Sequence, residues 1–140
     1  MGNMLELSPT EPHYDGKVIV LVDETSLSQA EYTAVSLQSA PHTVVIGSTT
    51  AGADGNLSSF PLPGGLRSAI SGLGVFYPDG APTQRVGVRV DIEVNPTLQG
   101  IRAGRDEVME AAIHQIVPGL SRVEVEKLAR ADRADLHPHR

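Results

Sequence analysis

Two short apolar runs with a helical stretch between them constrain the fold more than any other feature of the chain. The runs Lys17–Val22 and Thr43–Gly47 are rich in β-branched residues, which is typical of strands covered on both faces. The stretch from Ser28 to Ser39 is expected to form a helix that ends before Pro41. A strand, a helix and a strand within about 30 residues predict a right-handed βαβ unit with parallel strands.

The pattern changes after the second run, where glycine and proline separate shorter segments. These segments predict further strands at Ser58–Leu62, Leu66–Ser71, Gly74–Tyr77 and Arg85–Val94. Helices are then expected at Arg105–Ile116, whose first turn holds Asp106 and Glu107, and in the charged segment Ser121–Leu136. We therefore expect an α/β fold.

Composition narrows the class of protein. A chain of 140 residues suffices for one domain with a core. The net charge of -6, with acids and bases interspersed and no basic patch, argues against a nucleic-acid partner. The absence of cysteine excludes disulfides and thiolate metal sites, and no metal or cofactor motif is present. No apolar run reaches the ~18–20 residues of a membrane span, and the N-terminus does not resemble a signal peptide.

One turn has two interpretations. Ser28 lies where the first strand turns into the helix, and Ser28-Gln29-Ala30-Glu31 matches a capping box. A hydroxyl near the positive end of a helix dipole also suits a nucleophile that passes through an oxyanion. From these four residues alone, the cap is the simpler interpretation.

A second loop, from Ser48 to Asn56, follows the second strand of the unit. Its two glycines and its Asp-Gly pair allow positive φ or close backbone approach. It is expected at the carboxyl end of a parallel strand, as is the Ser28 turn, and sites in α/β sheets usually form at that edge. The loop lacks the Gly-Lys-Ser/Thr ending of a phosphate loop, and alone it is typical of a surface turn.

The segment from Val22 to Glu31 resembles the nucleophile segment of the tail-specific (carboxy-terminal processing) serine peptidases. That family includes the tricorn core proteases and the interphotoreceptor retinoid-binding proteins. Further matches follow in order: Val45-Ile46-Gly47, Thr50-x-Gly52, Phe76-Tyr77-Pro78-Asp79-Gly80, Gly87-Val88, Asp91-Ile92 and Arg105-Asp106. The resemblance covers roughly Lys17 to Ile116. It implies a crotonase-like (Clp-protease-like) core of β-β-α units, present here only as the C-terminal portion of that core.

The resemblance implies domain boundaries and roles for individual residues. Residues 1–16 would be a lead-in, 17–117 the core portion and 118–140 a charged tail, helical or frayed. Ser28 would be the nucleophile, the Gln29 N–H an oxyanion donor, and Glu31 a polar support that orients an active-site amine. Gly52, Asp54 and Asn56 would face Ser28, where the two polar residues could contact substrate, orient a base or only form a turn. Ala53 occupies the position of the lysine that many members use as general base.

The missing lysine leaves the base open, because a serine hydroxyl needs one at neutral pH. A histidine from a segment before residue 1 could serve, as in the tricorn-like branch. Within the chain, His42 is the one histidine near the expected core, but it opens a strand at the edge opposite Ser28. His13 and His114 are expected to face solvent. Alternatively, catalysis is lost and a binding or scaffold domain remains.

A weaker alternative is an acyl-CoA-type enzyme on the crotonase fold. The peptidase resemblance implies a peptide or protein substrate and an extracytoplasmic location, and it leaves a homo-oligomer open.

Overall fold

A three-stranded parallel sheet lies at the centre of the molecule. The computed structural model describes residues 11–135. The sheet contains β1 (Val18–Val22), β2 (Thr43–Gly47) and β5 (Ile92–Glu93), in the order β1-β2-β5. β1 and β2 run parallel in continuous register, from Val18 opposite Thr43 to Val22 opposite Gly47. The predicted parallel βαβ unit is confirmed.

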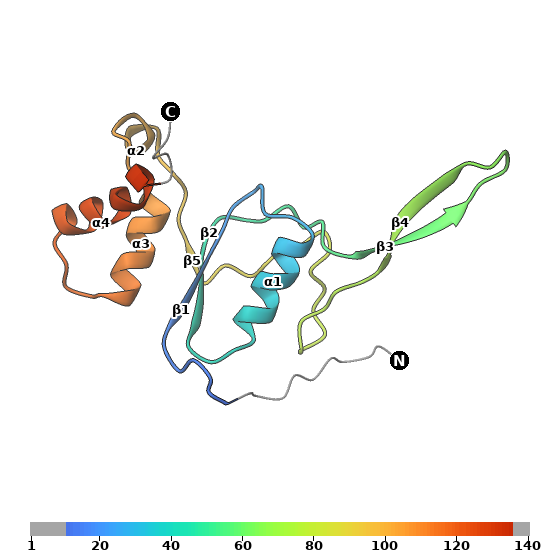
Figure 1. The fold of residues 1–140 in the computed structure, drawn as a ribbon, viewed down its shortest axis with the longest axis horizontal. Coiled ribbons are helices and arrows are strands. Elements are labelled where there is room, and N and C mark those ends of the chain that lie inside the picture. Colours follow the sequence, from blue (N-terminus) through green and yellow to red (C-terminus); the bar gives the residue numbers. More distant parts are fainter. Residues whose placement is uncertain (1–10, 136–140) are drawn as a thin grey trace.

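Helices cover the sheet from two sides (Figure 1). Helix α1 (Gln29–Gln38) packs on β1 and β2 from one side, and α3 (Glu107–Ile116) packs on the same strands from the other. The short helix α2 (Leu98–Arg102) precedes α3, and α4 (Arg122–Asp135) packs on α3. The buried core unites sheet, α1 and the segment before β5, through Val22, Ala34, Val35, Val45, Tyr77 and Val88. The fold is a mixed α/β domain, as expected.

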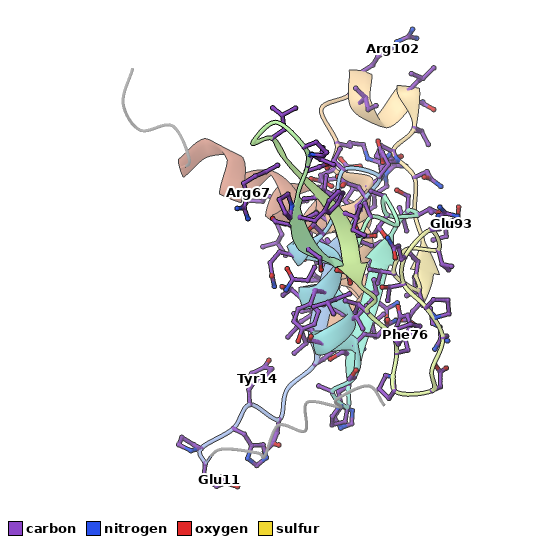
Figure 2. All side chains as sticks on the ribbon, turned by 90° about the vertical axis from the view of Figure 1, so that its right-hand side faces the viewer. Glu11, Tyr14, Arg67, Phe76, Glu93 and Arg102 are labelled. Carbon is purple, nitrogen blue, oxygen red and sulfur yellow. The ribbon has the colours of Figure 1, made fainter. Side chains whose placement is uncertain are left out.

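A hairpin projects from this body (Figure 1). Its strands β3 (Asn56–Pro61) and β4 (Arg67–Leu73) pair antiparallel, close to the predicted strands. Every residue from 56 to 74 is exposed, and Arg67 marks the hairpin in Figure 2. Six large apolar side chains are among the exposed residues: Leu57, Phe60, Leu62, Leu66, Ile70 and Leu73.

Of the predicted strands, one is absent and another is much shorter than expected. The segment Gly74–Tyr77 forms only an isolated bridge between Phe76 and Pro82. Of the segment Arg85–Val94, only β5 is a strand.

The backbone before β5 explains this difference. Arg85 and Gly87 have φ of 66° and 86°, which breaks the extended conformation. The Val88 N–H donates to Thr50 Oγ1 at 2.9 Å, and the Arg89 N–H donates to the Tyr77 hydroxyl at 2.8 Å. Because side chains accept these N–H groups, the segment needs no strand partner for them.

The inner face of α1 also differs from the expected apolar stripe. Ala34 and Val35 are buried as expected, but Ala30 is exposed and Leu37 is 42% exposed. Glu31 is fully buried in their place. The helix can point this carboxylate inward because the loop after β2 supplies hydrogen-bond donors for it. These hydrogen bonds offset the free-energy cost of removing the carboxylate from water.

Helices α3 and α4 begin within two residues of the expected positions, and the short helix α2 precedes them. Thr97 caps α2 by accepting from the Gly100 N–H, and Asp106 caps α3 by accepting from the Met109 N–H. Helix α4 buries Val125 but leaves Leu128 about half exposed. Figure 2 shows Arg102 on α2 at the end of the molecule opposite Glu11 and Tyr14 of the lead-in.

Parts of both chain ends lie outside the described residues. The expected frayed end His137–Arg140 and most of the lead-in lie outside the described residues. Among residues 11–135, no helix combines the length and the apolar character needed to cross a bilayer.

Candidate active site

Ser28 has an unusual backbone conformation at the turn between β1 and α1. Its φ is 54° and its ψ is -118°, the conformation of the first central residue of a type II′ turn, where glycine dominates. A residue with a Cβ is strained there by about 1–3 kcal/mol, and such strain clusters at functional sites. Ser28 is half-buried, so its side chain is accessible at the surface.

The predicted capping box is present in the relative placement of Ser28 and Glu31, but only the hydrogen bond to the Glu31 carboxylate has ordinary geometry. Ser28 and Glu31 face each other as in a capping box, and the Ser28 N–H donates to Glu31 Oε2 at 3.1 Å. The Ser28 hydroxyl itself makes no cap hydrogen bond of ordinary geometry. The hydroxyl is therefore not committed to the helix, and the first N–H groups of α1, including that of Gln29, have no partner within the helix.

The buried carboxylate of Glu31 joins α1 to the loop after β2. Its Oε1 accepts from the Thr50 hydroxyl at 2.5 Å and from the Gly52 N–H at 2.7 Å. Its Oε2 accepts from the Ala53 N–H at 2.9 Å and from the Ser28 N–H at 3.1 Å. Three backbone donors and one hydroxyl satisfy a side chain with no exposed surface. The described partners of Glu31 thus include no amine, and its expected role of orienting one stays a prediction.

The backbones of β1 and β2 lie very close together at the carboxyl ends of the two strands. A Cβ at Gly47 would lie 1.8 Å from the Val22 carbonyl oxygen, so only glycine fits. The Ser48 N–H donates to that same oxygen at 3.1 Å, and the Ala51 N–H donates to the Ser26 carbonyl at 3.0 Å. The loop of Gly52 and Ala53 is thereby held against the Ser28 turn, as the sequence predicted.

Asp23 shapes the start of the Ser28 turn. Its Oδ1 accepts from the hydroxyl and N–H of Thr25 at 2.7 and 2.9 Å, and from the Ser26 N–H at 3.1 Å. The Thr25 hydroxyl is the main cause that lowers the pKa of Asp23, because these bonds favour the ionised carboxylate. Asp23 is a turn former here.

The two polar residues predicted to face Ser28 behave differently. Asp54 is buried at 4% exposure, accepts from the Gly55 N–H at 2.9 Å, and lies 3.4 Å from the Thr83 hydroxyl. Burial raises its pKa, and the charge of Glu31 adds to that increase. Asn56 is exposed, begins β3 and accepts from the Leu57 N–H at 3.0 Å. Their contacts are those of turn formers, and their contact with a substrate stays a prediction.

No hydrogen bond or ion pair joins a lysine or histidine among the described residues to the Ser28 turn. Lys17 precedes β1, at the end of the strand opposite Ser28, and its Nζ donates to the Gln115 carbonyl at 2.9 Å. His42 is exposed at the start of β2, as predicted, and His114 is exposed in the last turn of α3. His13 is about half exposed and pairs with Glu11 and Asp15. Within residues 11–135, no three acidic or histidine side chains could hold a metal ion.

An open cavity of about 520 Å³ lies at the same end of the sheet, beside the turn. Asp23, Ser26 and Ser48 line it from the strand ends, and Ile101 and the segment 104–108 line it from α2 and α3. Ser28 does not line this cavity, so the cavity does not by itself form an active site around the serine.

Sequence reasoning missed two buried hydroxyls in this region. Thr50 is 6% exposed and Thr83 is fully buried. Thr50 lay in the Thr50-x-Gly52 motif, and that motif was the available signal. Its function as a hydrogen-bond link appears only when α1, the loop and the segment before β5 are brought together.

Comparison with known proteins gives the family. The model for "Peptidase family S41" matches residues 3–94. A presumed peptidase from Parabacteroides merdae ATCC 43184 superposes with a TM-score of 0.71 and 30% identity, over 79% of this chain and 35% of that one. No curated protein matches the chain.

Two further solved structures are similar. Mature CPAF complexed with lactacystin gives a TM-score of 0.58 and 26% identity over 68% of this chain and 19% of that one. The photosystem II D1 C-terminal processing protease, at 23% identity and a TM-score of 0.51 over 59% of this chain and 21% of that one, shows likeness of fold. The chain thus spans about a third or less of these structures. By its family match, the chain belongs to peptidase family S41.

Proposed function

We propose that this chain is the nucleophile-bearing portion of a serine peptidase core of the tail-specific, crotonase-like type. Ser28 attacks the peptide carbonyl, the Gln29 N–H stabilises the oxyanion, and the general base comes from outside the segment. The substrate is a peptide or protein. Membership of family S41 supports the peptidase class.

The backbone of Ser28 is the observation that carries this proposal. A strained residue between a strand and a helix, whose hydroxyl faces the Glu31 N–H without an ordinary cap hydrogen bond, is consistent with the geometry of a nucleophile elbow. A serine that served only as a cap would adopt an extended conformation.

The chemistry requires one proton acceptor and one oxyanion donor. The Ser28 Oγ forms a bond to the carbonyl carbon as its proton passes to the base, and the carbonyl π electrons move to the oxygen. The tetrahedral oxygen lies near the first N–H groups of α1, where the helix dipole favours negative charge. Its collapse expels the amine, which takes the proton from the base, and water then hydrolyses the acyl-serine.

The base position is the point where this chain departs from lysine-using relatives. Ala53 is exposed, and its N–H shares Glu31 Oε2 with the Ser28 N–H, which places the alanine beside the serine turn. A lysine here would bring its amine to the serine hydroxyl. Its absence supports a base, such as a histidine, supplied by another part of a longer protein.

The same absence favours a rival function, a non-catalytic binding or scaffold domain on the same fold. The described residues place no base at Ser28, and glycine and backbone contacts account for the shape of the loop. In that case the Ser28 conformation would be a remnant of an ancestral site.

Labelling with a fluorophosphonate separates the two. The 140-residue chain is incubated with the probe, with and without added imidazole as a substitute base, beside S28A, S36A and A53K. Because the base lies outside the segment, we expect the isolated chain to be inactive and to show at most background labelling. Imidazole or A53K should increase Ser28-dependent labelling on the order of 10–100-fold, and S28A should show none. S36A, which removes an exposed hydroxyl of α1, should match the wild type.

Equal labelling of S28A and wild type would exclude Ser28 as the nucleophile. If neither imidazole nor A53K increases Ser28-dependent labelling, the binding or scaffold function is the better assignment.

A further inference from the structure

Four of the five buried polar residues among those described surround the loop after β2. They are Glu31, Thr50, Asp54 and Thr83, while the fifth, Glu110, pairs with Arg105 at the other helices. Buried polar groups are costly unless fully paired, so a connected set of them specifies one arrangement of the backbone. Within this group, Thr50 is hydrogen-bonded to Glu31, and Glu31 is hydrogen-bonded to the Ser28 N–H.

The hydrogen bonds of Thr50 have one consistent direction. The Val88 N–H donates to Thr50 Oγ1 at 2.9 Å, and the hydroxyl, having a single proton, donates to Glu31 Oε1 at 2.5 Å. Glu31 Oε2 in turn accepts from Ser28. The chain of bonds therefore runs from the segment before β5, through Thr50 and Glu31, to the backbone of the nucleophile.

The orientation of the Glu31 carboxylate depends on this link. Thr50 and Gly52 hold Oε1, and this fixes the plane of the carboxylate so that Oε2 can accept from Ala53 and Ser28 together. Without the Thr50 hydroxyl, the carboxylate keeps one donor on Oε1 and can rotate. The hydrogen bond that holds the strained Ser28 N–H would then weaken.

The fold leaves room for this hydroxyl. A Cβ at Gly87 would lie 2.6 Å from Thr50 Oγ1, and Gly87 has a φ of 86°. Glycine at this position is thus required both by the backbone conformation and by the threonine beside it.

We propose that Thr50 is a positioning residue for the nucleophile: acting through Glu31, it holds the Ser28 backbone and the Ala53 loop in one fixed arrangement. This inference rests on the proposed role of Ser28, but the geometry on which it acts can be measured without activity.

The test compares T50V, which keeps the volume and removes the hydroxyl, with T50S, which retains the hydroxyl. Amide hydrogen exchange of the 140-residue chain is followed by NMR at Ser28 and Ala53, with the Val45 amide of the core as internal control. We expect both site amides to exchange about ten- to hundredfold faster in T50V, as fits the loss of a charge-assisted hydrogen bond. T50S should stay close to wild type, and Val45 should change little in either variant.

The second readout is the fluorophosphonate reaction in the presence of imidazole, measured against probe concentration. T50V should lower the maximal labelling rate while the half-saturating probe concentration stays constant, because the nucleophile is displaced but the probe surface is not. T50S should restore the rate.

The outcomes separate the two proposals. Unchanged exchange at Ser28 and Ala53 in T50V, or equal loss in T50S, overturns the role of Thr50 whether or not Ser28 reacts. Absence of Ser28-dependent labelling both with imidazole and in A53K, together with altered exchange in T50V, overturns only the peptidase role. Should T50V fail to fold, the wild type still tests the arrangement, because rapid exchange of the Ser28 and Ala53 amides, at the rate of unprotected amides, would refute a carboxylate that is held in place by Thr50.

Discussion

Replacing Ser28 by glycine should stabilise the protein, whereas replacing it by alanine should change stability little. At φ 54° and ψ -118°, any residue with a Cβ is strained by about 1–3 kcal/mol. Glycine removes this strain but loses about 0.5–1 kcal/mol through the greater freedom of the unfolded chain. The net expectation for S28G is a gain of about 1 kcal/mol over wild type.

Alanine is the matched control because it keeps the Cβ and removes only the hydroxyl. Since the hydroxyl faces the Glu31 N–H as in a capping box but makes no cap hydrogen bond of ordinary geometry, S28A should lie within about 0.5 kcal/mol of wild type. If the hydroxyl capped α1, S28A would instead cost about 1 kcal/mol and S28G a few tenths. The two accounts therefore differ in the sign of the S28G effect.

Thermal and urea unfolding, both followed by circular dichroism, measure this. A gain of about 1 kcal/mol corresponds to a Tm increase of about 3–5 °C for a domain of this size. A Tm of S28G at or below that of wild type would refute the inference of strain, and with it the structural basis for Ser28 as an elbow.

Three further predictions follow from the described contacts. E31Q should destabilise the fold by about 2–4 kcal/mol in urea unfolding, because an amide group would face backbone donors, whereas E93Q, at an exposed glutamate, should change little. Burial raises the pKa of Asp54, so the folded protein favours the protonated carboxyl group. The stability that this group contributes is therefore fully present below the unfolded pKa of 3.8 and is lost as the pH increases through the folded pKa. The Tm of D54N minus the Tm of wild type should therefore be larger at about pH 7 than at about pH 4. The same Tm difference at both pH values would contradict this. R105M should lower the Tm, because it leaves the buried Glu110 carboxylate without its ion pair, and a Tm equal to that of wild type would argue against that role.

The parallel unit and its two loops could be predicted because local signals agree there. The β-branched runs, the helix between them and the stop before Pro41 all point to the same βαβ unit, and both predicted boundaries of β2 are correct. The position of Ala53 beside the Ser28 turn also followed from motif order. These features depend on residues near each other in sequence or on a common sheet edge.

The rest depends on contacts between distant segments. The Arg85–Val94 segment has strand-like residues, yet side chains of Thr50 and Tyr77 accept its N–H groups. Glu31 looked like a cap partner or a support for an amine, and only the folded loop supplies the four donors that bury it. Positive φ at a serine cannot be inferred from composition, because glycine is the residue that normally signals it.

The projecting hairpin implies that the molecule has two levels of local stability. No residue from 56 to 74 is buried, so little apolar contact couples the opening of β3 and β4 to the unfolding of the sheet. Its amides should exchange orders of magnitude sooner than those of β2, and a protease of broad specificity should cleave first near Pro63, Gly64 and Gly65. Because Glu31 anchors the preceding loop independently, the nicked protein should keep the Ser28 turn intact.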